Sequence, residues 1–312
     1  MKTNTKPPAK TPAKAPIKPS VKAPVKAPAK ASGKAQADVP EKAQKKGGKV
    51  FLLTFLIVLA VLGAVWAGLF FWKQMPEEQA PTLEIDETNP NVLGQIPPAG
   101  NEADIQNSLD YAIGQTPDAV GWIQIPDTDI NGLIMQADDN RYYERRNEDG
   151  NYDVYGCYFA DYECALGARE DFSQNTIVYG HGNSTDDPNG KRFSQLFRFL
   201  DQDFAQKHPY VTITTQEGSY IFQIFSIFYT STDFNYIEVN MNDRKKLSIA
   251  NKALELSIYD YGVTVSEEDR LLTLSTCALA EGKENERFVV MGKLCPENFS
   301  KKESILLTKR EP

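Results

Sequence analysis

Residues 271–277 read LLTLSTC, and residues 287–293 read RFVVMGK. Both runs are short and apolar, which is typical of buried strands. Two antiparallel neighbours joined by the intervening loop would bring Cys277 and Arg287 to the same end of a sheet. A thiol beside a cation has the surroundings that nucleophilic sulfur chemistry requires. A cysteine taken alone is more often a small buried apolar residue, so the neighbouring residues decide its role.

A histidine completes this set. His181 follows the predicted strand 176–179 in the run YGHGN. Gly180 and Gly182 flank it, so the backbone can turn there and the imidazole can stand free of neighbours. With His181 to move protons and a nearby arginine to offset negative charge, Cys277 would have the partners of a catalytic nucleophile.

The other cysteines and the second histidine carry less chemistry. Four Cys in 312 residues are too few for a disulfide-stapled small protein. Cys157 and Cys164 are close enough in sequence to form a disulfide outside the cell, with Cys295 left over. They could equally stay unpaired, and the spacing does not decide between a disulfide and free thiols. His208 precedes a proline at a loop-to-strand junction, and we interpret it as a surface turn residue.

The remaining pattern consists of many short strands and a few helices. We expect strands at 121–125, 131–135, 176–179, 210–214, 220–229, 271–275 and 287–293, and helices at 105–114, 193–204 and 243–259. The apolar residues of the helix 193–204 fall on one face: Phe193, Leu196, Phe197, Leu200 and Phe204. Those of the helix 243–259 fall at helical spacing, namely Leu247, Ala250, Leu254 and Ile258, and Asn242 or Asp243 can cap this helix. This order favours a mainly β fold with a barrel-like mixed sheet. No glycine-rich nucleotide motif and no metal-spaced Cys or His occurs, so we expect no cofactor and no metal.

Residues 50–72 form the longest apolar run, 23 residues without a charge. A helix of this length spans roughly 30 Å, which is the thickness of the hydrocarbon core of a bilayer. Lysines flank its start, and glutamates soon follow its end, which predicts a cytoplasmic N-terminus and an extracytoplasmic body. A cleaved signal peptide is the alternative, but its apolar region is usually only about 7–15 residues long. We therefore expect a retained single-pass anchor.

Residues 1–49 are a basic arm. They contain thirteen Lys against one Asp and one Glu, a net charge of +11, while the whole chain carries −8 and the remainder therefore −19. Eight prolines forbid a continuous helix, so we expect a disordered cytoplasmic tail that lies on anionic lipid. Charge alone would also suit nucleic acid, but no aromatic residue is interleaved for base stacking, and we expect no nucleic-acid partner.

The rest of the chain divides into three parts. Residues 73–102 are rich in Pro, Glu, Asn and Gln and read as an extracytoplasmic linker. Residues 103–295 would form the catalytic domain, and 296–312 a short charged tail. The acidic residues of the domain, Asp186, Asp187, Glu267, Glu268 and Asp269, lack the spacing of a calcium loop and read as a solvated surface.

These motifs together resemble the sortase family, most closely a class B sortase. The resemblance covers about residues 104–294 and is carried by VGWIQIPDTDINGLIMQADDNRYY at 120–143, NTIVYGHGN at 175–183, FSQLFRFLDQDFAQKHP at 193–209, and LLTLSTC followed by ERFVVMGKL. One departure is the sequence YGHG where class B members often have YGHN. The resemblance therefore identifies the histidine but does not extend to the loop that follows it. A lid segment and a second anchor, typical of the pilin-polymerising class, are not seen.

The resemblance implies a fold and an activity. The fold would be the eight-stranded sortase β-barrel with the added helices of class B at 104–115 and 243–259. Cys277 would be the nucleophile, His181 the general acid and base, and Arg287 the group that binds substrate and steadies the oxyanion. Ser275 would assist substrate binding, with ordinary strand hydrogen bonding as its alternative role.

The implied reaction is transpeptidation at the surface of a Gram-positive cell. The enzyme would cleave the sorting signal of a secreted protein after its Thr through a thioester, then transfer the protein to an amine of the peptidoglycan cross-bridge or to a pilin Lys. Two alternatives stay open, an L,D-transpeptidase acting directly on peptidoglycan and a catalytically inactive membrane-anchored scaffold. The sorting motif, the acceptor amine and the oligomeric state are not determined by the sequence.

Overall fold

A computed structural model describes residues 47–74, 83–182, 186–278 and 286–310. The predicted basic arm lies, up to residue 46, outside the described residues. The chain forms two compact units, Met1–Met75 and Pro76–Pro312. In the first unit, helix α1 covers Gly47–Gln74 and includes the predicted anchor. In the described part of the chain, no helix is both long and apolar enough to cross a membrane. The anchor at 50–72 stays a prediction.

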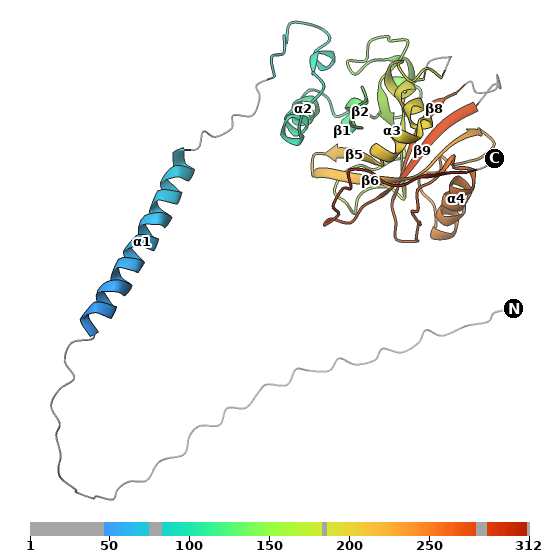
Figure 1. The fold of residues 1–312 in the computed structure, drawn as a ribbon. Helices are drawn as coiled ribbons and strands as arrows, with labels where there is room; N and C mark the ends of the chain where they lie inside the picture. Colours follow the sequence, from blue (N-terminus) through green and yellow to red (C-terminus); the bar gives the residue numbers. More distant parts are fainter. Residues whose placement is uncertain (1–46, 75–82, 183–185, 279–285, 311–312) are drawn as a thin grey trace, which may run out of the picture. The chain divides into compact units, whose positions relative to one another are not determined.

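The second unit is built on a closed barrel of eight strands (Figure 1). Its strands are β1 (Ala119–Gln124), β2 (Asn131–Met135), β3 (Tyr158–Ala160), β4 (Asn175–Tyr179), β5 (Tyr210–Thr215), β6 (Gly218–Ser231), β8 (Leu271–Cys277) and β9 (Glu286–Leu294). They follow one another around the barrel in the order β1-β2-β3-β4-β8-β9-β6-β5, and β5 pairs with β1 to close it. The pairs β2–β3 and β4–β8 are parallel and the others antiparallel. The predicted mainly β, mixed barrel is confirmed.

Strand β8 is buried on both faces, which explains its continuous apolar character. Leu272 and Leu274 point into the main core of the barrel. Leu271, on the opposite face, belongs to a second core beneath helix α4. Residues 273, 275 and 277 share that outer face, because side chains alternate along a strand. The outer face of β8 therefore leads from a buried core to the exposed Cys277 at the strand end.

Helix α2 (Glu102–Gln115) confirms the helix predicted at 105–114. Asn101 caps it, since its side-chain oxygen accepts the backbone N–H of Asp104 at 3.0 Å. The buried residues Ile105, Leu109 and Ala112 recur at helical spacing. They pack in one cluster with Trp122 of β1, and Figure 1 shows α2 beside that strand.

The single helix predicted at 193–204 is wrong. The chain forms a 3₁₀ helix, η3 (Arg192–Leu200), and then a separate helix α3 (Gln202–Lys207). Asp201 divides them, because its carboxylate accepts the N–H of Phe204 at 2.9 Å and starts the second helix. Leu200 is consequently 39% exposed instead of buried.

Helix α4 (Asp243–Leu256) begins at the predicted cap Asn242 but ends earlier than expected. The chain continues into the short strand β7 (Tyr259–Asp260), which pairs with β10 (Thr308–Lys309). The face of α4 that is buried carries Lys246, Ile249, Ala250 and Ala253, whereas Leu247, Leu254 and Ile258 are only partly buried. The Lys246 ammonium bonds the Gln174 side chain at 2.8 Å and the Glu267 carbonyl, which lets this charge occupy the buried face.

Parts of the predicted linker and tail pack against the barrel unit. Leu93, in the 3₁₀ turn η1 (Leu93–Gln95), is buried, and its N–H donates to Asp149 at 2.7 Å. The carbonyl of Ala99 accepts from the side chain of Asn131 at 2.8 Å. Near the C-terminus Leu307 is also buried. These hydrogen bonds and buried side chains tie both ends of the unit to the barrel.

Candidate functional site

The nucleophile and the cation predicted from sequence lie opposite one another. In the antiparallel pair β8–β9, Cys277 is in register with Arg287. Both therefore stand at the same end of the sheet, which confirms the expected placement. Cys277 is exposed, whereas Leu274, Ser275 and Thr276 before it are buried. The strand thus delivers its thiol to the surface at the point where burial ends.

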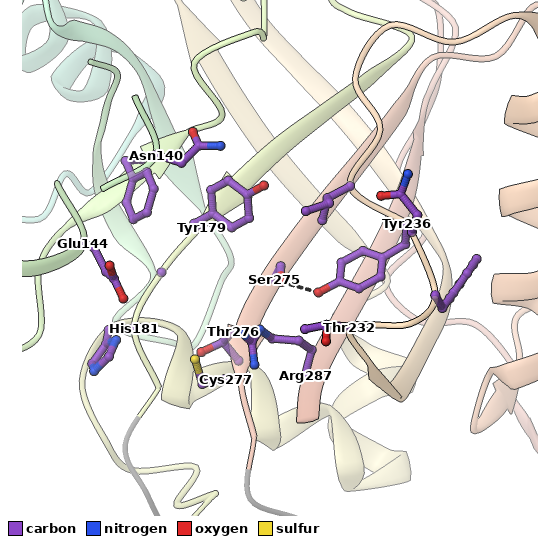
Figure 2. A pocket seen from close by; sticks show the side chains of 15 residues that line it. Asn140, Glu144, Tyr179, His181, Thr232, Tyr236, Ser275, Thr276, Cys277 and Arg287 are labelled. Carbon is purple, nitrogen blue, oxygen red and sulfur yellow. Dashed lines mark hydrogen bonds between the residues drawn. The ribbon is translucent and has the colours of Figure 1, made fainter. Parts of the chain in front are cut away.

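His181 is brought to the same edge by the parallel pairing of β4 with β8. Tyr179 is in register with Ser275, so residue 181 is level with Cys277. The Gly180 N–H continues the ladder by donating to the Ser275 carbonyl at 3.3 Å. The His181 carbonyl in turn accepts the N–H of Phe193 at 3.1 Å. Figure 2 shows His181, Cys277 and Arg287 along one edge of the pocket.

The two glycines beside His181 are needed for close packing and not for a turn. Neither is among the described glycines with positive φ. A Cβ on Gly180 would lie 2.6 Å from the ring of Phe193, and one on Gly182 would lie 2.6 Å from Thr276 Oγ1. The small size of these glycines lets the histidine segment lie directly against η3 and the end of β8.

A cavity of about 340 Å³ opens beside these three residues. Its lining is Asn140, Glu144, Phe159, Tyr179, Gly180, His181, Thr232, Phe234, Asn235, Tyr236, Ile237, Ser275, Thr276, Cys277 and Arg287. One side comes from β4, from Asn140 and from Glu144 of η2 (Tyr143–Arg145), and the other from the loop between β6 and α4 (Figure 2). Its lining combines apolar and aromatic side chains with a few polar groups, as is usual for ligand-binding pockets.

Asp161, which sequence reasoning missed, holds one side of the cavity in place. It is 4% exposed, and a single oxygen of its carboxylate accepts the Tyr179 hydroxyl and the Asn140 side-chain N–H, each at 2.8 Å. Burial, followed by the nearby Asp161 charge, raises the pKa of Tyr179 far above its ordinary value. Tyr179 therefore stays protonated and keeps its O–H directed at Asp161.

Ser275 lines the cavity and is paired with the opposite side. Its hydroxyl shares a hydrogen bond of 2.9 Å with the Tyr236 hydroxyl, drawn in Figure 2. Burial raises the pKa of Tyr236, while the hydrogen bond to Ser275 and the positive charge of Arg287 oppose that rise. Ser275 is thus in contact with a tyrosine of the loop on the other side of the cavity.

The environment of His181 favours the neutral imidazole. Half-burial lowers its pKa from the ordinary value, and the positive charge of Arg145 lowers it further. The negative charge of Glu144, which lies above His181 in Figure 2, acts in the opposite direction. A neutral imidazole is able to accept the proton of a thiol.

The remaining sequence candidates lie away from this site. His208 is buried and not a surface residue as expected: its ring nitrogens lie 2.8 Å from the Phe204 carbonyl and from the Asp127 carboxylate. Cys157, Cys164 and Cys295 are all buried and unpaired. Over 83–182, 186–278 and 286–310, no group of three or more His, Cys, Asp or Glu is arranged to hold a metal ion.

A closed eight-stranded barrel that presents a strand-end cysteine between a histidine and an arginine defines the sortase class of fold and site. The sequence matches the family profile of the Sortase domain over residues 123–295, more than half of the chain. The chain therefore belongs to the sortase family.

The relatives within the family are of class B. The chain is 37% identical to Sortase B of Listeria monocytogenes over 178 residues and 31% identical to Sortase B of Staphylococcus aureus over 180 residues; each match covers 57% of this chain and 70% of the relative. The S. aureus sortase B–substrate complex superposes with a TM-score of 0.55 at 28% identity, covering 62% of this chain and 87% of that one. Sortase B of B. anthracis in complex with AAEK1 superposes with a TM-score of 0.53 at 30% identity, covering 66% of this chain and 91% of that one. Membership of this family implies a cysteine transpeptidase.

Proposed function

We propose that this protein is a cell-surface sortase that cleaves a C-terminal sorting signal after Thr and transfers the protein to an amine. The observation that carries the proposal is the exposed thiol of Cys277, in register with Arg287 and level with His181, at the edge of a cavity of about 340 Å³. One solved structure of the related S. aureus sortase B is a complex with its substrate, which supports a substrate-binding site on this fold.

In the first half-reaction the Cys277 sulfur attacks the carbonyl carbon of the Thr. His181 takes the thiol proton and gives it to the leaving amine, so the C–N bond breaks and a thioester forms. Arg287 offsets the negative charge that develops on the carbonyl oxygen. In the second half-reaction an acceptor amine, from a peptidoglycan cross-bridge or a pilin Lys, attacks the thioester and releases the thiol.

Ser275 is proposed to assist substrate binding. Its hydroxyl lies in the lining of the cavity two residues before Cys277, on the same face of β8. Its one described partner is the Tyr236 hydroxyl, and a hydroxyl has one donor and two acceptor positions. Capacity therefore remains for a backbone group of the peptide.

The protein is proposed to act on the outer side of the cell membrane, with its N-terminus in the cytoplasm. The support is the 23-residue uncharged run at 50–72 and the lysines that precede it. Transfer to cell-wall amines requires a catalytic domain outside the cytoplasm.

The test uses the full-length protein with a panel of peptides carrying different sorting motifs, and with oligoglycine or diaminopimelate peptides as amines. Mass spectrometry detects cleavage after Thr and a thioester on Cys277, with Cys277→Ala as the control. We expect the wild type to give both products and the variant to give neither, while its stability changes by only about 0.5 kcal/mol because the side chain is exposed. Hydrolysis of peptidoglycan peptides alone would favour an L,D-transpeptidase, and no reaction by the folded enzyme would favour an inactive scaffold.

A further inference from the structure

One side of the cavity is a loop without regular structure. The β6–α4 loop, residues 232–242, contributes a third of the cavity lining, namely Thr232, Phe234, Asn235, Tyr236 and Ile237. A loop of this length loses conformational freedom if it has to become ordered around a substrate. Its position relative to Cys277 therefore depends on what holds it against the barrel.

The backbone of this loop is bonded to a buried side chain of the sheet. Asn175, the first residue of β4, is fully buried. Its side-chain nitrogen donates to the carbonyl of Tyr236 at 3.1 Å and to the carbonyl of Glu238 at 3.2 Å. Its side-chain oxygen accepts the hydroxyl of Thr273 at 2.7 Å. Both N–H groups and the oxygen of the Asn175 amide thus have hydrogen-bond partners, which explains how this polar side chain is accommodated in the interior.

The same face of β8 bears three connected residues. Thr273, Ser275 and Cys277 alternate along the strand, and each step of two residues advances about 7 Å. Thr273 donates to the side-chain oxygen of Asn175. The side-chain nitrogen of Asn175 holds the loop backbone, and Ser275 bonds the Tyr236 hydroxyl. The strand that presents the thiol therefore also fixes the loop across the cavity from it.

We propose that Asn175 is a positioning residue for substrate, which holds the β6–α4 loop at a set distance from Cys277 so that a peptide meets a preformed groove. Asn175 does not line the cavity and does not touch the reacting atoms. Its effect is exerted through the two carbonyls that it binds. The proposal rests on the peptide-transfer function proposed above, but the placement of the loop is measurable without turnover.

Two nearly isosteric variants separate this role from ordinary stability. Asn175→Asp keeps the acceptor for the Thr273 hydroxyl and replaces the donor with an oxygen that repels the carbonyls of Tyr236 and Glu238. Thr273→Val removes the third hydrogen bond and leaves both bonds to the loop. Each variant leaves a buried polar group unsatisfied, so both should lower the melting temperature. Only Asn175→Asp should release the loop.

The readouts are hydrogen exchange of the loop amides, peptide kinetics and alkylation of Cys277 by iodoacetamide. For Asn175→Asp we expect faster exchange across 232–242, a roughly tenfold higher KM and little change in kcat, since about two hydrogen bonds are lost. For Thr273→Val we expect loop exchange and KM close to wild type. The alkylation rate should match wild type in both, because the thiol is exposed and untouched.

Three outcomes would overturn the proposal. They are wild-type loop exchange in Asn175→Asp, an unchanged KM in that variant, and an equal rise of KM in Thr273→Val, which would point to general destabilisation. If the wild type turns over no peptide, the peptide-transfer function fails and the exchange result alone decides the role of Asn175. If Asn175→Asp does not fold, native-state exchange of the wild type decides: loop amides that open together with β4 support the proposal, and loop amides that open independently contradict it.

Discussion

A methyl group at position 182 has no space in the folded protein. The Cβ of an alanine there would lie 2.6 Å from Thr276 Oγ1 and 2.8 Å from the carbonyl oxygen of Cys277. Favourable contacts between heavy atoms begin near about 3.5 Å. The carbonyl belongs to the backbone of β8, so rotation of a side chain does not relieve the clash. Gly182→Ala must therefore push the segment that carries His181 away from the strand that carries the thiol.

The expected size of the effect follows from the tightness of the packing. Overpacking of this kind costs about 1–3 kcal/mol. In a unit of this size each kcal/mol lowers the melting temperature by about 2–4 °C. Misplacement of catalytic groups by about 1 Å costs about 100-fold in turnover. We therefore expect a modest loss of stability and a large loss of kcat in Gly182→Ala.

Gly114→Ala is the matched control. Gly114 lies in α2, a Cβ there meets nothing within 4 Å, and alanine is favoured over glycine in a helix by about 1 kcal/mol. This variant should be equally active and slightly more stable. Peptide turnover, thermal unfolding and the alkylation rate of Cys277 are measured on both. A Gly182→Ala protein with wild-type kcat would refute the argument, whatever its melting temperature.

Three further predictions concern charge. The charge of Arg145 lowers the pKa of His181, and that of Glu144 raises it. In an NMR titration of the His181 ring, Arg145→Met should therefore raise the pKa and Glu144→Gln should lower it. Shifts of the same sign in both variants would contradict this reasoning. Since the pKa of His181 is lowered in the folded protein, its contribution to stability is present above its unfolded pKa near 6.5 and is lost as the pH falls through the folded value. The Arg192 guanidinium is paired with the Glu148 carboxylate at 2.8 and 3.2 Å, and Glu148→Ala leaves it without this partner. Chemical denaturation should show a free energy of unfolding lower by about 3 kcal/mol. A loss below about 1 kcal/mol would show that the pair behaves as an exposed one.

Some expectations from the sequence were wrong because local pattern and tertiary packing disagree. The apolar spacing of 193–204 is helical, but the capping carboxylate of Asp201 divides the segment. In α4 the apolar residue Leu247 is only partly buried, while Lys246 is buried because Gln174 and Glu267 satisfy its ammonium. A period read from one segment does not include partners that lie elsewhere in the chain.

The sequence by itself determined the strands that carry the chemistry and the meeting of Cys277 with Arg287. These follow from short-range information: two short apolar runs and a connection short enough for antiparallel pairing. The position of His181 after a buried strand was also predicted from the sequence. That His181 lies near the thiol depends on the parallel pairing of β4 with β8, which the tertiary structure shows.

Only the tertiary structure decided which groups hold the cavity in shape. The Asn175 side chain bonds a carbonyl 61 residues away, its Thr273 partner is 98 residues away, and Asp161 reaches Asn140 across 21 residues. No periodicity or motif predicts such pairs, because the local sequence around each residue indicates only an ordinary polar residue in or beside a strand. Their roles arise when barrel closure buries them, since a buried polar group must find its partners among whatever the fold brings near.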